Sequence, residues 1–376
     1  MDLALSQAGK GKIINLGIGA PDGMPPIKAI EALNEASLRP DAHAYQSYKG
    51  LPALRKAFSS WYSRYYGVSL DPDSEIQPLI GSKEGILLIS LAFVNKGDKV
   101  LVPDPGYPTY TSASKLAEAE ILTYGLTAGN NWLPDFEALE KQDLSKVKIM
   151  WTNYPNMPTG ADADKALYQR LADFGRRHNI LIVNDNPYSF ILNDKPLSIL
   201  SAEGAKECCL ELNSLSKAHN MSGWRIGMVC GASDYISQVL KVKSQMDSGM
   251  FKPLQLAAVE ALSQGPEWFK SLNEEYAKRR ILAGRIFDTI GAEYDKNSKG
   301  MFLWGNIRPD NKLLDLRSCG KSVGERVSDR ILYDAGVFIT PGFIFGRNGE
   351  DYIRVSLCAG ASLLEKAREN IEKLFI

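Results

Sequence analysis

Apolar runs of strand length alternate with helical patterns through the middle of this chain. Seven runs have the composition of strands, at residues 76–80, 99–102, 121–124, 147–152, 180–185, 208–213 and 225–230. Helical patterns at 83–94, 163–178 and 235–246 are interleaved with them. This alternation predicts βαβ units, and therefore an α/β fold with a mostly parallel sheet between two layers of helices. Residues 180–183 are continuously apolar, as expected of a parallel strand buried on both faces.

The pattern of the sequence changes after Pro266. A long charged helix is expected at about 267–290, followed by a strand-like run at 300–305, a polar helix, a second strand-like run at 351–357 and a final helix. These elements predict a smaller α+β domain. We therefore expect an N-terminal arm that joins the small domain at 1–40, a large domain at 41–280 and a small domain at 281–376.

Composition narrows the possible partners. The 376 residues contain 44 basic and 44 acidic side chains, so we expect no bulk binding to nucleic acid or anionic membranes. Five cysteines without a CxxC pair suit reduced thiols, and no metal site is predicted. Residues 1–12 lack the apolar core of a signal peptide, and the apolar run 86–94 is too short to cross a bilayer. These features predict a cytoplasmic protein.

The segment 213–227 concentrates reactive side chains. Ser214, Ser216, Lys217 and Arg225 place two hydroxyls, an amine and a guanidinium within about a dozen residues. An amine can condense with an aldehyde, while hydroxyls and a guanidinium can hold a phosphate dianion. The segment therefore indicates pyridoxal 5'-phosphate as a cofactor.

Two further positions suit the same cofactor. Ser82 and Lys83 follow a predicted strand and open a helix, whose free N–H groups attract phosphate, although any turn of this kind favours small capping residues. Asp185 ends the most apolar strand, where an acid is costly unless it is paired or serves a ligand. It is either a loop or capping acid, or the partner of a protonated pyridine nitrogen, with Tyr188 donating to a ring hydroxyl.

Two other residues have a plain and a functional interpretation. Arg354 lies in an alternating strand-like run, where it is either a solvated edge residue or a bidentate clamp for a substrate carboxylate. Tyr107 lies in a proline-rich turn, which by itself predicts only a turn, although an aromatic ring there can cover a flat cofactor.

Two motifs match hydrolases only formally. The string Ser214–Lys217 fits SxxK, but the accompanying SDN and KTG motifs do not occur. The string at 320–324 fits GxSxG, but the histidines, at positions 43, 178 and 219, all precede it, whereas that type of hydrolase needs a later histidine. We therefore do not expect a serine hydrolase.

Taken in order, these motifs resemble the class I/II aminotransferases of the aspartate aminotransferase fold, which is fold type I of pyridoxal-phosphate enzymes. The resemblance runs from the Asn-Leu-Gly-Ile-Gly-Ala-Pro-Asp string at 15–22 to Arg354. It implies a seven-stranded large domain, with Lys217 as the Schiff-base lysine and proton shuttle. It also implies roles in holding the cofactor or the substrate for Ile18, Gly19, Tyr45, Ser82, Lys83, Tyr107, Asn156, Asp185, Tyr188, Ser214, Ser216, Arg225 and Arg354. Tyr45 matches a tyrosine that, in this family, reaches the phosphate in the neighbouring subunit. The resemblance therefore implies a homodimer with shared active sites.

One position departs from the family pattern. An asparagine usually precedes Pro-Thr-Gly and bonds the ring hydroxyl of the cofactor, but this chain has Met157 there. Methionine cannot donate a hydrogen bond. Either Asn156 is shifted into the role, or Tyr188 acts alone and the cofactor titrates differently; we favour the second interpretation.

The sequence thus predicts ping-pong transfer of an amino group from an L-amino acid to a 2-oxo acid. A β-lyase of the same fold is the alternative, and a non-catalytic ligand sensor is a remote one. Selectivity for the substrate side chain is expected to depend on loops near Ile18, Tyr110 and 246–252. The sequence of these loops does not identify the substrate.

Overall fold

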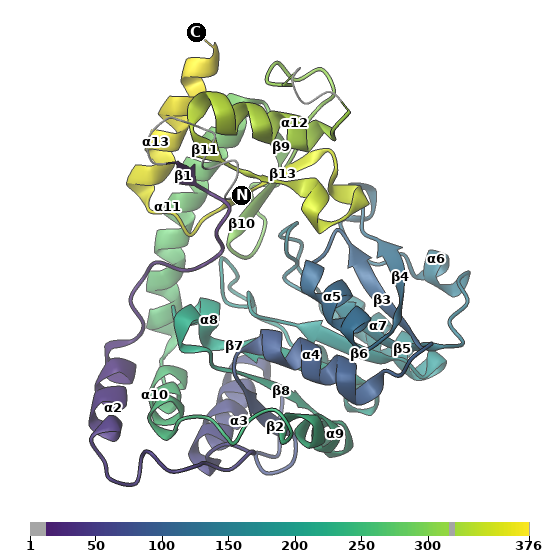
Figure 1. Cartoon of the computed structure of the whole chain (residues 1–376), viewed down its shortest axis with the longest axis vertical. Coiled ribbons are helices and arrows are strands. Elements are labelled where there is room, and N and C mark those ends of the chain that lie inside the picture. The colour runs from purple at the N-terminus through teal and green to yellow at the C-terminus, as the bar shows by residue number, and fades with distance from the viewer. Residues whose placement is uncertain (1–12, 316–319, 376) are drawn as a thin grey trace.

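A computed structural model of the chain describes residues 13–315 and 320–375. A large α/β body forms the lower part of the molecule, and a smaller body with its own sheet lies above it (Figure 1). Cys319 lies outside the described residues, and the other four cysteines are free and buried. In the described part of the chain, no helix is both long and apolar enough to span a membrane.

The large body is built on a seven-stranded sheet with the order β2-β8-β7-β6-β5-β3-β4. Its strands are β2 (Ile76–Leu79), β3 (Lys99–Asp104), β4 (Glu120–Gly125), β5 (Val147–Thr152), β6 (Leu181–Asp185), β7 (Cys209–Ser214) and β8 (Gly227–Gly231). Each of the seven predicted runs forms a strand. All neighbours are parallel except that β8 is antiparallel to both β2 and β7. The predicted fold class is therefore confirmed, with one reversed strand.

Alternate residues of the strands enter different cores, as the two-residue period of a strand requires. In β5, Ile149 and Trp151 join a core on one face of the sheet, whereas Met150 joins the core on the other. The first face is covered by α4 (Ser82–Phe93), α5 (Pro108–Leu116) and α9 (Ser233–Lys243). The opposite face is covered by α3 (Pro52–Tyr66), α7 (Lys165–His178) and α10 (Lys252–Leu262), with α2 (Ile27–Ser37) packed on α10.

The smaller body surrounds a four-stranded sheet with the order β12-β13-β10-β9. Its elements are β9 (Glu293–Tyr294), β10 (Phe302–Asn306), α12 (Val323–Arg330), β12 (Thr340–Pro341), β13 (Tyr352–Ser356) and α13 (Ala361–Glu372). Near the N-terminus, β1 (Ile14–Asn15) pairs with β11 (Val337–Phe338). Ile14 and Leu16 consequently belong to the small core.

The long helix α11 (Pro266–Ile290) connects the two bodies (Figure 1). Phe269, near its start, packs into the core of the large body, whereas Tyr276 and the later buried residues Ala283, Ile286, Phe287 and Ile290 pack into the small core. The predicted boundary at residue 280 falls inside this helix. The division into domains at 40 and 280 stays a prediction.

Candidate active site

Most of the predicted site residues meet at one edge of the large sheet. Asp185 ends β6 and Ser214 ends β7. Arg225 lies two residues before β8, which starts at this edge because it runs in the opposite direction. A pocket of about 390 Å³ lies here, against the small body. Its lining includes Gly19, Ser82, Lys83, Tyr107, Asp185, Tyr188, Ser214, Ser216, Lys217, Arg225 and Arg354.

Lys217 lies in the short helix α8 (Leu215–Ala218), which the side chain of Ser214 caps by accepting from the N–H of Ser216 at 2.9 Å. The Lys217 amine donates to the carbonyl of Gly19 at 2.6 Å. Burial lowers the pKa of this amine, and the nearby charges of Arg225 and Arg354 lower it further. A larger neutral fraction makes the amine a better nucleophile and base.

Arg225 lies against the turn that precedes α4. Its backbone is left-handed, with φ +57°, an uncommon conformation for a residue with a side chain. Its guanidinium donates to the carbonyl of Ser222 at 2.8 Å, and it is 3.5 Å from both the Ser216 hydroxyl and the Ile80 carbonyl. The cation thus lies beside the N-terminus of α4, which begins at Ser82. A helix N-terminus with an adjacent guanidinium suits a phosphate.

The buried carboxyl group of Asp185 has, in the described structure, a hydrogen-bond partner at only one of its two oxygens. Its Oδ2 accepts a hydrogen bond from the Tyr110 hydroxyl at 3.0 Å, while its Oδ1 has no partner among the described residues. Burial raises the pKa of this carboxyl to about 7. A buried acceptor without a partner is costly, so a donor that enters the pocket with a positive charge would be stabilised here.

Arg354 comes from β13 in the small body and reaches the same pocket. Its guanidinium carbon lies 4.0 Å from the centre of the Phe302 ring and 4.7 Å from that of Phe345. One nitrogen donates to the carbonyl of Gly17 at 2.8 Å, and Nε is buried without a partner in the described structure. Burial lowers the pKa of Arg354 to about 10. Such a cation suits an incoming carboxylate.

The departure at Met157 has a defined geometry. Its thioether lies 3.3 Å from Nη1 of Arg354, and the residue lines the pocket. The Asn156 amide instead serves the turn: it accepts from the N–H and hydroxyl of Thr159 and donates to the carbonyl of Asn153. Asn156 is outside the pocket lining. This arrangement favours Tyr188 over Asn156 as the donor to the ring hydroxyl, and both roles stay predictions.

Two other predicted residues are not brought into the pocket of the single chain. Ile18 is 56% exposed, although its neighbour Gly19 lines the pocket. Tyr45 is 90% exposed on a loop outside the pocket. Their roles stay predictions.

Several pocket residues were not predicted as site residues, namely Asn153, Ser222 and Phe302, and Tyr110 was predicted only to mark a loop that affects selectivity. Tyr110 is the one with a signal in the sequence, because it follows Tyr107 by three residues in a helix that begins at Pro108. Residues three apart share a helix face, and the two rings lie 5.6 Å apart at 84°. The Phe302 ring packs edge-on against Tyr188 at 5.9 Å, a contact between the two bodies.

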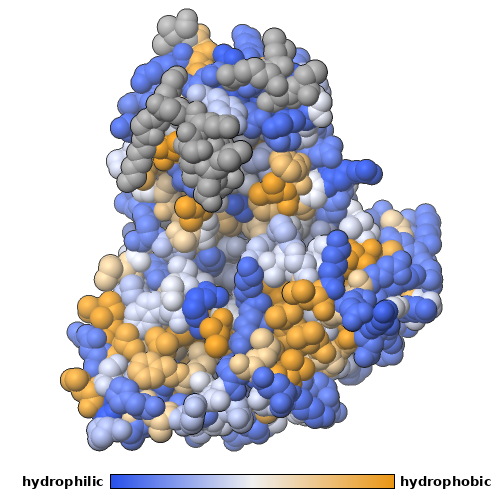
Figure 2. Space-filling view, in the orientation of Figure 1, coloured by the Kyte–Doolittle hydropathy of each residue, from blue (hydrophilic) through white to orange (hydrophobic). Residues whose placement is uncertain are grey.

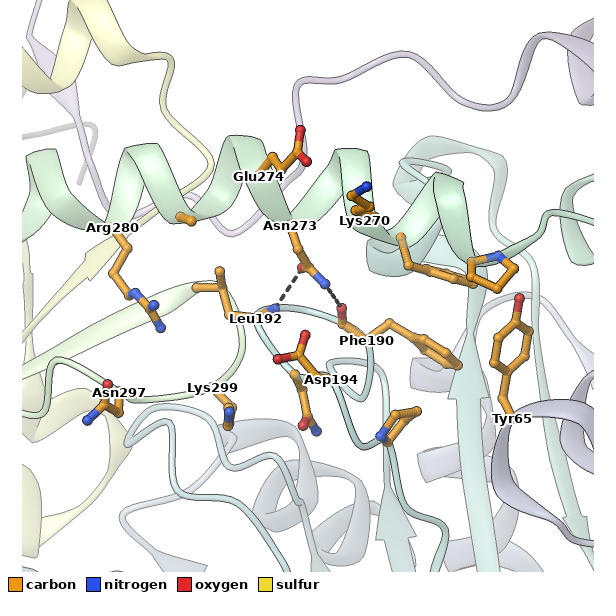
Figure 3. Close-up of a pocket in the computed structure, with 15 residues that line it drawn as sticks. Tyr65, Phe190, Leu192, Asp194, Lys270, Asn273, Glu274, Arg280, Asn297 and Lys299 are labelled. Carbon is orange, nitrogen blue, oxygen red and sulfur yellow. Dashed lines mark hydrogen bonds between the residues drawn. The ribbon is translucent and has the colours of Figure 1, made fainter.

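A second pocket, of about 580 Å³, lies between α11 and the segment that follows Tyr188 (Figure 3). Asn273 of α11 ties this segment down, because it accepts from the N–H of Leu192 at 2.8 Å and donates to the carbonyl of Phe190 at 2.9 Å (Figure 3). The predicted site residues do not line this pocket.

The donor set at the sheet edge fits pyridoxal phosphate. The unpartnered oxygen of Asp185 suits a protonated ring nitrogen, the Lys217 amine suits an aldehyde, and Arg225 at the start of α4 suits a phosphate. All three lie in one pocket.

Comparison with known proteins agrees with this fit. The family model for "Aminotransferase class I and II" matches residues 11–371. The LL-diaminopimelate aminotransferase of Dehalococcoides mccartyi (strain CBDB1) is 39% identical over 366 residues, which cover 97% of this chain and 92% of that protein. The LL-diaminopimelate aminotransferase of Aquifex aeolicus (strain VF5) is 39% identical over 364 residues, covering 96% and 91%.

Solved structures are similar over the whole length. Substrate-bound BacF from Bacillus subtilis has a TM-score of 0.91 and 38% identity, covering 99% of this chain and 93% of that one. A probable N-succinyldiaminopimelate aminotransferase from Thermus thermophilus has a TM-score of 0.90 and 28% identity, covering 99% and 98%. The β-lyase alternative is not favoured by these relatives. The chain therefore belongs to the class I and II aminotransferases, and it is a transaminase that uses pyridoxal phosphate.

Proposed function

We propose that Lys217 is the residue that binds the aldehyde of pyridoxal phosphate and moves the proton during transamination. The observation that carries this proposal is that its partly buried amine shares a pocket with the unpartnered Oδ1 of Asp185. When bound, the cofactor supplies an aldehyde that accepts the amino group and a ring that withdraws electrons from the substrate α-carbon. Asp185 favours the protonated ring nitrogen, which that withdrawal requires.

The remaining roles follow from the position of each group. Ser82, Lys83, Ser214, Ser216 and Arg225 would hold the phosphate, Tyr107 would cover the ring and Tyr188 would donate to its hydroxyl. Arg354 would bind the α-carboxylate of the donor, near the Gly19 backbone. The lowered pKa of Lys217 lets the amine accept a proton from the α-carbon of the substrate and return it.

We also propose a homodimer in which Tyr45 reaches the phosphate of the partner subunit. Tyr45 is almost fully exposed, and other large apolar side chains are exposed with it, namely Leu38, Ile80, Met246 and Phe251. Apolar surface gathers over α2, α10 and α4 in Figure 2. Exposed apolar patches of this kind are typical of interfaces. Sedimentation equilibrium tests the dimer, and a monomer at micromolar concentration would contradict it.

We propose LL-diaminopimelate as the donor to test first, because the similar curated proteins carry that substrate in their names. A half-reaction screen measures the loss of the cofactor's visible absorbance with each amino acid. Aromatic amino acids, aspartate and alanine are the comparison donors, and 2-oxoglutarate added after the donor should restore the absorbance. A faster reaction with one of them would refute the substrate and leave the transaminase activity intact.

The Lys217→Ala variant tests the central assignment. We expect turnover to be lost, and borohydride to fix cofactor on Lys217 in the wild type only. The Lys206→Ala variant is a matched control, because Lys206 pairs with Glu75 at the other end of β2, away from the pocket. Normal turnover by Lys217→Ala would refute the assignment. Ammonia and pyruvate formed from cystathionine without an acceptor would instead indicate a β-lyase.

A further inference from the structure

We propose that Lys243 is a positioning residue that joins the phosphate-binding turn to the loop that carries Tyr45. The inference rests on the proposed function, in which that turn and Tyr45 each contact a phosphate. Lys243 is the last residue of α9 and its side chain is 1% exposed. It lies outside the pocket lining, so its effect on the cofactor would be indirect.

Two carboxylates from different parts of the chain hold the buried ammonium. Its Nζ lies 3.0 Å from Oε1 of Glu84 and 2.5 Å from Oδ2 of Asp247. The side chains of Glu84 and Asp247 are themselves only 13% and 18% exposed. An ammonium is stable out of water only when such partners compensate its charge. The three side chains therefore constrain one another.

Glu84 connects this cation to the phosphate turn. It is the third residue of α4, and its Oε2 accepts from the N–H of Ile80 at 2.6 Å. The carbonyl of Ile80 faces Nη2 of Arg225 at 3.5 Å. Between Ile80 and Ser82, Gly81 has φ +77°, and a Cβ there would collide with the Arg225 guanidinium. The Glu84 carboxylate thus fixes the turn against the arginine.

Asp247 connects the same cation to the Tyr45 loop. Its Oδ1 accepts from the N–H of Gly249 at 3.1 Å. Gly249 has φ +88°, and a Cβ there would collide with the Gln46 carbonyl, so the two backbones are in direct contact. Gln46 is the neighbour of Tyr45. A second tie lies beside it, where Gln255 accepts from the N–H of Leu51 at 2.7 Å and donates to the Met250 carbonyl at 2.6 Å.

One buried charge therefore links the phosphate-binding turn to the Tyr45 loop, in addition to the hydrogen bond from the Gln77 amide of β2 to the Tyr48 carbonyl. A partner subunit that holds the Tyr45 loop in place would also hold Asp247, and through Lys243 it would hold Glu84. The turn at residues 80–82 would then keep the conformation that binds phosphate. Each subunit would then hold its own phosphate best when its Tyr45 loop is docked.

The test compares pyridoxal phosphate with pyridoxal, which lacks the phosphate. The dissociation constant of each is measured on the apo form of the full chain, by absorbance and by quenching of tryptophan fluorescence. For Lys243→Met we expect affinity for pyridoxal phosphate to fall at least about tenfold, the size of one lost charge-assisted hydrogen bond. Affinity for pyridoxal should stay within about twofold, so that the preference for the phosphate shrinks. An unchanged preference would overturn the inference.

Three further variants sharpen this result. Asp247→Asn changes only the side of the Tyr45 loop, and the inference requires that it too lowers the preference and adds little to Lys243→Met. If Asp247→Asn leaves the preference intact, Lys243 does not join the two loops. Should Lys243→Met not fold, Glu84→Gln takes its place with the same expectation. Lys206→Met, which breaks the Lys206–Glu75 pair, is the control and should change neither affinity. A wild type without any preference for the phosphate would refute the proposed phosphate turn itself.

Discussion

The Tyr110 hydroxyl donates a hydrogen bond of 3.0 Å to one oxygen of Asp185 and leaves the other oxygen of the same carboxylate without a partner. Tyr110 is itself held by stacking on Trp151, with ring centres 5.2 Å apart and planes 6° from parallel. The carboxylate is therefore fixed in rotation, with its unpaired oxygen available to a ligand.

Removing this bond should weaken the electron withdrawal that Asp185 supports. The bond lowers the pKa of Asp185 against the effect of burial, so Tyr110→Phe should raise that pKa. A hydrogen bond to a charged group contributes about 1.5–3 kcal/mol. We expect kcat/KM to fall about tenfold or more and the acid limb of its pH profile to move to higher pH. Tyr124→Phe is the control, because that buried hydroxyl donates to the Trp151 carbonyl instead; equal effects in both variants would contradict this role.

Restoring the asparagine that the family pattern has at Met157 should change how the bound cofactor titrates. An amide N–H that donates to the ring oxygen favours its ionised form. Met157→Asn should therefore lower the pKa that the visible absorbance of the bound cofactor reports. Asn156→Ala should leave that pKa in place, because the Asn156 amide is used by its own turn. A clear shift in Asn156→Ala alone would show that Asn156 contacts the cofactor after all.

Arg354 should favour donors that carry an α-carboxylate over amines that lack one. Lysine at this position keeps the charge but loses the forked donor geometry. Arg354→Lys should raise KM for an amino acid donor by about tenfold or more. The matching amine without a carboxylate serves as the comparison, and its slow half-reaction should change little. If the amine loses as much rate as the amino acid, Arg354 acts on the reaction in some other way.

The free energy of unfolding of the apoenzyme should depend on pH through the carboxyl group of Asp185. Burial raises the pKa of Asp185 from 3.8 to about 7. A carboxyl with a raised folded-state pKa stabilises the fold fully below pH 3.8, and this stabilisation is lost as pH rises through about 7. Asp185→Asn should flatten this part of the stability profile. Urea denaturation of both apoproteins from pH 4 to pH 8 measures it, and parallel profiles would refute the expectation.

The strands of the large sheet were predictable because they are buried on both faces. Residues 180–183 are continuously apolar, and this run became β6 with a shift of one residue at its start. The helix α3 was not predicted. Its buried residues Leu54, Phe58, Trp61 and Tyr62 have helical spacing, so the sequence did contain a signal for this helix.

Site residues that lie close together in the sequence could be predicted as a group. Contacts between residues that lie far apart in the sequence could not. Lys217 and Arg225 are close in the sequence, and their chemistry is evident from their types. The contact of Met157 with Arg354 spans 197 residues, and the bond from Tyr110 to Asp185 spans 75. Such pairs depend on the register of the sheet and on the docking of the small body, which local patterns do not encode.

The reversal of β8 has a consequence for how this pocket can change. In an all-parallel sheet, successive strands are joined by crossovers of a dozen residues or more, so neighbouring groups at one edge come from separate segments. Here β7 ends at Ser214 and β8 begins at Gly227 on the same edge. Lys217, the proposed ligand of the aldehyde, and Arg225, the proposed ligand of the phosphate, therefore lie in one short segment between two neighbouring strands. An insertion between Lys217 and Arg225 would therefore displace both groups at once.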